Sequence, residues 1–210
     1  GKENILARYV LQHIYLCCNT LIIPLRSTAM AKWTVDTSHT DVQFKVKHLM
    51  INTVTGEFTS YRVDVDAPGD DFADATFSFE ADVASISTKN EMRDNHLKSD
   101  DFFNAEKFPV MKFSGKGLTK TSENEFVLHG DLTIRDVTKP VTLNAEYGGQ
   151  MVDFYGNVKA GFDLTGSLNR KDFGLSWNGV TEAGGIVVSD NVKLILNVQL
   201  QKLVAENIVA

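Results

Sequence analysis

The chain has 210 residues and a formal net charge of -6, with 43% hydrophobic and 23% charged residues. This composition is globular and excludes a collagen, a coiled coil and a wholly disordered chain, and the length suits one domain with an appendage. Residues 1–30 carry Lys2, Arg8 and Arg26 against Glu3, so the negative charge belongs to the rest of the chain. Nucleic-acid binders usually present a basic stripe, so we expect no nucleic-acid partner.

Residues 1–30 differ in character from everything that follows. The apolar run from Ile5 to Leu25 is interrupted by polar residues, which makes it too polar for a membrane span, and an amphipathic helix is one alternative. We favour an upstream in-frame extension, with Met30 as the natural start of a cytoplasmic protein. The other explanation is a signal peptide cleaved near Ala31, which would make the protein periplasmic. An exposed apolar helix in this segment would also favour a homodimer.

Residues 31–205 are predicted to form one all-β barrel domain. Apolar and polar residues alternate with the period of two that is typical of half-buried strands, as in 42–48. The alternation predicts eight strands, at residues 33–49, 52–66, 73–84, 110–119, 125–135, 138–147, 154–168 and 190–203. A phase change near Thr59 and Ser60 indicates a bulge. Strands with one apolar and one charged face favour an antiparallel sheet, and such a sheet closed into a barrel has an apolar lumen.

A short helical insert interrupts the predicted strands between the third and the fourth. Thr88, followed three residues later by Glu91, has the pattern of a capping box, and this predicts a helix from Lys89 to Lys98. The turn after it carries Phe102 and Phe103. We expect this insert to cover one end of the barrel.

Several stretches of the chain carry a resemblance to a known family. They are Trp33-Thr34-Val35-Asp36 with Ser38-His39, Phe44-Lys45-Val46-Lys47-His48-Leu49, Thr55-Gly56-Glu57-Phe58, Arg93-Asp94-Asn95-His96-Leu97-Lys98-Ser99, Gly130-Asp131-Leu132-Thr133-Ile134 and Asn169-Arg170-Lys171-Asp172-Phe173-Gly174. In this order and spacing they resemble the YceI-like family of polyisoprenoid-binding proteins over almost all of residues 32–203. The resemblance implies a lipocalin-like, eight-stranded antiparallel barrel that takes an isoprenoid, a quinone precursor or a fatty-acid derivative into its lumen.

The candidate ligand-binding residues follow from the alternation and from the insert. The apolar candidates are Phe44, Val46, Phe77, Phe79, Phe102, Phe103, Phe113, Leu132, Ile134 and Phe162, and His48 falls in phase with the strand that contains Phe44. The alternative is that these side chains fill the barrel as an ordinary core, because a barrel of eight strands is wide enough for either outcome.

A polar head group would need donors at the barrel mouth. We expect Arg93, His96 and Arg170 there, with the two arginines holding a phosphate or a carbonyl. The alternative is that Arg93 and Asp94 bind neighbouring groups and fix the helix to the rim.

The sequence shows no catalytic motif and no histidine spacing typical of a metal site. We therefore expect a binding protein with no metal and no cofactor. Two alternatives stay open. One is an enzyme that acts on a prenyl or lipid amphiphile at the barrel mouth, with His48 or His96 as general acid or base. The other is a filled structural barrel that binds only a partner.

Overall fold

The computed structural model describes residues 30–69, 72–179 and 187–203. The leader assigned to residues 1–30 therefore lies, except for Met30, outside the described residues. The elements in chain order are β1 (Ala31–Val35), η1 (Thr37–His39), β2 (Asp41–His48), β3 (Asn52–Phe58), β4 (Tyr61–Ala67), β5 (Thr76–Asp82), η2 (Val83–Ser85), β6 (Ile86–Ser87), α2 (Glu91–Lys98), β7 (Val110–Lys120), β8 (Glu125–Ile134), β9 (Val137–Val152), β10 (Val158–Asn169), η3 (Arg170–Phe173) and β11 (Val188–Lys202).

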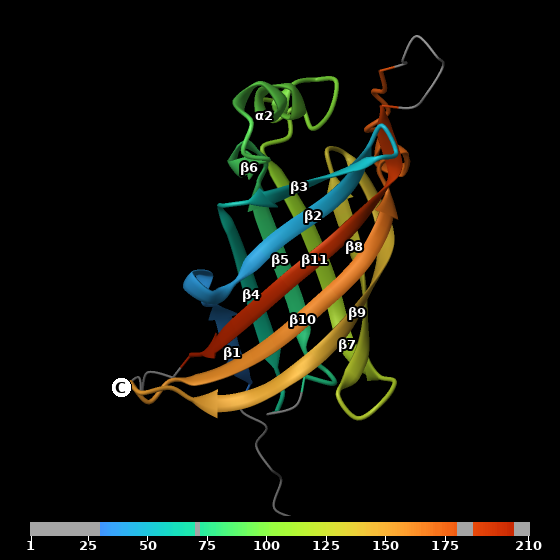
Figure 1. Ribbon diagram of the computed structural model, residues 1–210. Coiled ribbons are helices and arrows are strands. Elements are labelled where there is room, and N and C mark those ends of the chain that lie inside the picture. The colour runs from blue at the N-terminus through green and yellow to red at the C-terminus, as the bar shows by residue number, and fades with distance from the viewer. Residues whose placement is uncertain (1–29, 70–71, 180–186, 204–210) are drawn as a thin grey trace, which may run out of the picture.

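The strands close into an antiparallel barrel. Neighbouring strands follow the order β1-β4-β5-β7-β8-β9-β10-β11, and β11 returns to β1 with Trp33 opposite Lys202. The strands wrap obliquely around a common axis in Figure 1. This closure confirms the prediction of an all-β, eight-stranded antiparallel barrel. The prediction was possible because the alternation of apolar and polar residues specifies which face of each strand is buried.

Each of the first two predicted strands is broken, and the prediction of two continuous strands is wrong. The first consists of β1 and β2, separated by η1, because the side chain of Asp36 accepts a hydrogen bond from the backbone N–H of Ser38 and caps a 3-10 turn. The second consists of β3 and β4. Instead of the predicted bulge, Thr59 and Ser60 pair with the segment that leads into β6, where the N–H of Thr59 donates to the carbonyl of Ser85.

The predicted insert is present between β5 and β7, and its helix α2 lies above one end of the barrel (Figure 1). The predicted start of the helix is wrong. Asn90 is the N-cap and accepts from the N–H of Arg93, because the hydroxyl of Thr88 is engaged by the side chains of Arg93 and Asp94 instead. Within the described ranges, no helix has the length and hydropathy needed to cross a bilayer.

Aromatic side chains fill the end of the barrel opposite α2. The ring of Phe72 lies 5.2 Å from Trp33 and 5.0 Å from Phe162, and Tyr147 lies 5.0 Å from Phe162, all between centroids. A second apolar cluster, which contains Phe58, Ile134 and Phe173, lies toward α2. The two clusters lie toward opposite ends of the barrel.

Candidate ligand cavity

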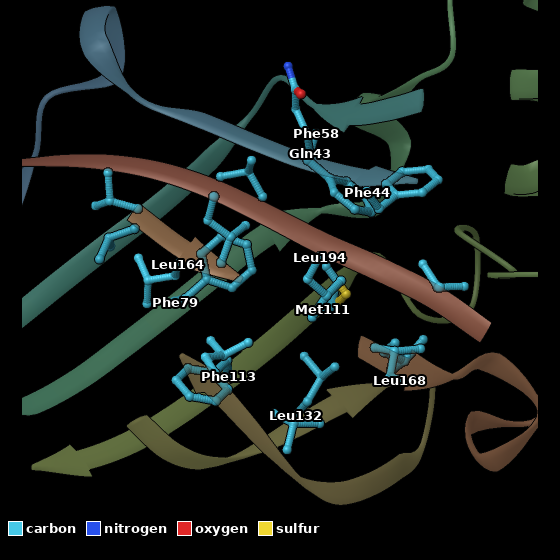
Figure 2. Close-up of a pocket in the computed structure, with 18 of the residues that line it drawn as sticks. Gln43, Phe44, Phe58, Phe79, Met111, Phe113, Leu132, Leu164, Leu168 and Leu194 are labelled. Atoms are coloured by element: carbon cyan, nitrogen blue, oxygen red, sulfur yellow. The ribbon is translucent and has the colours of Figure 1, made fainter. Parts of the chain in front are cut away.

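A cavity of about 220 Å³ lies inside the barrel between the two clusters. Figure 2 shows side chains from strands all around the barrel, including Phe79, Phe113 and Leu194, pointing toward a common interior. The atoms that face the cavity are apolar. Gln43 lies beside it, but its amide points away from the other labelled side chains (Figure 2). The arrangement therefore suits an apolar chain and offers no polar partner along the walls.

Glycines in the strands keep one large ring close to the barrel wall. A β-carbon at Gly130 would lie 2.4 Å from the Cζ atom of Phe113, and one at Gly115 would lie 2.9 Å from its Cε1 atom. The ring of Phe113 thus occupies space that two side chains would otherwise take. The sequence reasoning missed these glycines, although an isolated glycine inside a strand pattern is a recognised sign that another group approaches the backbone closely.

The insert and the segment after η3 together cover the α2 end of the cavity. Leu97, Phe102 and Phe103 line the cavity from the insert, and the ring of Phe103 meets that of Phe58 edge-on at 6.2 Å. Trp177 joins the two covering segments, because its ring lies 5.3 Å from Phe102 and meets that of His96 edge-on at 4.7 Å. Two separate pieces of chain thus meet over the mouth.

Eleven of the predicted site residues line the cavity: Phe44, Val46, Phe77, Phe79, Phe102, Phe103, Phe113, Leu132, Ile134, Phe162 and Arg170. The remaining three, His48, Arg93 and His96, are not among the lining residues. His48 is the last residue of β2, where the chain turns away through Leu49 and Met50. The Nε2 atom of His96 lies 2.9 Å from Oδ2 of Asp101.

The side chain of Arg93 binds Thr88, which lies just before α2. Its Nε–H donates to Oγ1 of Thr88 at 2.6 Å and its Nη2–H donates to the Thr88 carbonyl at 2.9 Å. Oδ1 of Asp94 accepts from the backbone N–H of Thr88 at 2.8 Å. This geometry is the one expected if Arg93 and Asp94 fix the helix to the rim.

Arg170 is 3% exposed, and all five of its N–H donors have acceptors. Nε–H donates to the carbonyl of Ser189, Nη1 donates to the carbonyls of Leu175 and Trp177, and Nη2 donates to the carbonyl of Val188 and to Oδ1 of Asp190. Desolvation lowers the pKa of the guanidinium from its ordinary value, and the carboxylate of Asp190 opposes that effect. Arg170 therefore ties the loop after β10 to the start of β11.

The ionic group with the largest pKa shift among the described residues lies away from the cavity. Oδ2 of Asp36 accepts from Nζ of Lys159 at 2.7 Å and from Nε2 of Gln199 at 3.1 Å. The hydrogen bond from Lys159 is the main reason that the pKa of Asp36 falls to about 2, and the contact with His39 contributes as well. Through these bonds Asp36, in the segment between β1 and β2, is held to Lys159 of β10 and Gln199 of β11.

Metal binding has no support in the part of the chain that the structure describes. No three His, Cys, Asp or Glu side chains are grouped there closely enough to hold an ion. The expectation that the protein has no metal and no cofactor stays a prediction.

A family model identifies the family to which this chain belongs. Residues 33–200 match the model described as the YceI-like domain. The chain belongs to the YceI-like family. A UPF0312 protein of Staphylococcus aureus strain N315 is 37% identical over 165 residues, which is 78% of this chain and 94% of that protein.

Solved structures share the YceI-like barrel. The YCEI protein of Campylobacter jejuni superposes with a TM-score of 0.64 at 36% identity, over 81% of this chain and 97% of that one. Burkholderia cenocepacia BcnA superposes with a TM-score of 0.67 at 20% identity, over 79% of this chain and 98% of that one. A polyisoprenoid binding domain from Saccharophagus degradans superposes with a TM-score of 0.58 at 12% identity, over 81% of this chain and 98% of that one. The last two likenesses show the fold alone.

Proposed function

We propose that the barrel binds the apolar chain of a long-chain amphiphile, an isoprenoid or a fatty-acid derivative, and so sequesters or carries it. The observation that supports this proposal is a cavity of about 220 Å³ whose facing atoms are apolar. A cavity of this kind excludes polar ligands, because a buried polar group without a hydrogen-bond partner is costly. The Saccharophagus degradans neighbour described as a polyisoprenoid binding domain has the same fold and adds support.

The cavity volume limits the length of chain that fits without rearrangement. An apolar protein cavity of ~150 Å³ holds one benzene ring, so a cavity half as large again holds roughly ten carbons, or about two isoprene units. A longer chain requires the covering side chains of the insert to move.

A series of straight-chain alcohols tests this proposal by isothermal titration calorimetry. Each added methylene buries apolar surface worth about 0.8 kcal/mol, so the dissociation constant should fall about fourfold per carbon up to roughly ten carbons. Beyond that length the gain per carbon should shrink. Geraniol should bind like the straight alcohol of the same length, since a purely apolar wall cannot distinguish them strongly. Failure of hexanol, octanol, decanol and geraniol alike to bind would overturn the proposal.

A further inference from the structure

Strand pairing leaves an opening in the barrel wall between β9 and β10. Their ladder begins with Val152 opposite Val158 and ends with Leu143 opposite Gly166. Beyond this point β9 runs on along β8 as far as Val137, and β10 runs on along β11 as far as Asn169. The facing edges of 138–142 and 167–169 are joined by no ladder.

A groove of about 660 Å³ lies on the outer side of this opening, and we call it the wall groove. Val141 and Leu168 line both the wall groove and the apolar cavity, so the two spaces are neighbours. Phe173 from η3 also lines the wall groove and is buried in the cluster near α2. These three apolar side chains separate the outside of the barrel from the cavity.

Several polar side chains of the wall groove are uncommitted, although Thr142 is bound to His129 and Asn169 accepts from the N–H of Lys171. Lys139 and Lys193 both line it and are exposed, and neither has an ion-pair or hydrogen-bond partner among the residues that the structure describes. The same holds for the side-chain amides of Asn144 and Asn191, whereas Asp172 is the one acidic residue in the described lining. The groove therefore presents two free ammonium groups against one carboxylate.

The three groups expected to bind a head group at the α2 end of the cavity already have internal partners. Arg170 has no N–H left to donate, and Arg93 is bound to Thr88. His96 is bound to Asp101, and its ring contacts those of Phe102 and Trp177. A head group bound by Arg170 would have to displace internal partners, which Lys139 and Lys193 of the wall groove do not require.

We propose that the wall groove binds the anionic head, a phosphate or a carboxylate, of an amphiphile whose chain occupies the cavity. The chain passes between Val141 and Leu168 when the ring of Phe173 moves aside. Because no ladder spans this part of the wall, passage breaks no backbone hydrogen bond of the sheet. The inference rests on the proposed function and adds the site and the charge of the head group.

The test compares geranyl phosphate with geraniol, which share one chain and differ in the head. In the unchanged protein, two lysine contacts worth about 0.7 kcal/mol each should favour the phosphate about tenfold in dissociation constant. In the double variant K139Q/K193Q this preference should fall to within about twofold while geraniol binds as before. The matched control K116Q/K120Q removes the same charge from exposed positions on β7 and should keep the tenfold preference.

The outcomes separate the two proposals. If K139Q/K193Q retains the full preference for geranyl phosphate, the wall groove is not the head site, although the cavity still binds chains. If neither geranyl ligand binds the unchanged protein, the proposed function fails and this inference fails with it.

Residue-resolved acylation of lysines adds a direct readout of the site. Geranyl phosphate should protect Lys139 and Lys193 from an amine-reactive reagent, and inorganic phosphate at the same concentration should not. Equal protection by inorganic phosphate would mark a free-phosphate site and would overturn the link with the cavity.

Discussion

The ring of Phe44 occupies space that exists only because its partner across the β2–β3 ladder is Gly56. A β-carbon at position 56 would lie 2.2 Å from the Cζ atom of Phe44, far inside van der Waals contact. The ring therefore rests close to the barrel wall, as the ring of Phe113 does beside Gly130. Both rings line the cavity, so the volume left for a ligand depends on these glycines as much as on the rings themselves.

Gly56→Ala should push the ring of Phe44 into the cavity. Overpacking of this kind costs about 1–3 kcal/mol of unfolding free energy, and the smaller cavity should weaken decanol binding. Urea denaturation and calorimetry measure the two effects. Gly161→Ala is the matched control, because a β-carbon there meets nothing within 4 Å. Unchanged decanol affinity in the Gly56 variant would show that this ring does not define the cavity.

Arg170→Lys should destabilise the barrel without changing its preference among ligands. A lysine cannot supply five donors, so several buried carbonyl groups lose their partners, and the expected loss is roughly 2–4 kcal/mol of unfolding free energy. Chemical denaturation measures it. Since every N–H of Arg170 is already used within the protein, the ratio of geranyl phosphate to geraniol affinity should stay the same. A collapse of that ratio would assign Arg170 to the head group instead.

Asp36→Asn should reduce the unfolding free energy at neutral pH by about 2 kcal/mol, because the folded state lowers the pKa of this carboxyl from 3.8 to about 2. A lowered folded-state pKa gives stability that is complete above the unfolded-state pKa and is lost as the pH falls through about 2. Denaturation at pH 7, 4, 3 and 2 should therefore show a steeper acid loss in the unchanged protein than in the variant. Parallel pH profiles would contradict this account of the Asp36–Lys159 pair.

Phe103→Ala should lengthen the chain that the cavity accepts. Removing this ring from the insert opens a volume of about one benzene, so the alcohol length at which affinity stops improving should move up by roughly four to six carbons. The calorimetric series on the variant measures that length. Phe108→Ala is the control, because Phe108 belongs to the same insert, does not line the cavity and instead lies under Lys107 and Arg135. An unchanged limit in the Phe103 variant would show that the insert does not set the length.

The alternation of apolar and polar residues was sufficient to predict the barrel. It placed residues such as Phe79 and Leu132 on the inner face, because the side-chain period of a strand leaves one face for the core. It did not reveal the break at Asp36, although residues 36–41 are all polar and interrupt the apolar alternation where the 3-10 turn forms. It also assigned the cap of α2 to Thr88, whose hydroxyl has other partners in the folded chain.

The candidate site was predictable in its apolar part and not in its polar part. Inward position follows from local sequence, whereas the use of a charged group depends on distant segments. Arg170 is an example, because its acceptors come from the loop after η3 and from the residues around the start of β11. The wall groove depends on where the ladder between β9 and β10 ends, and no property of either strand alone shows that position.

Crystals soaked with 10-bromodecanol test the central claim most directly, because bromine gives an anomalous signal that locates the chain. We predict a bromine peak inside the barrel, within contact distance of Phe113, Leu132 and Leu194, which line the cavity. A barrel interior without a peak, in crystals where the alcohol is bound only on the outer surface, would contradict the account.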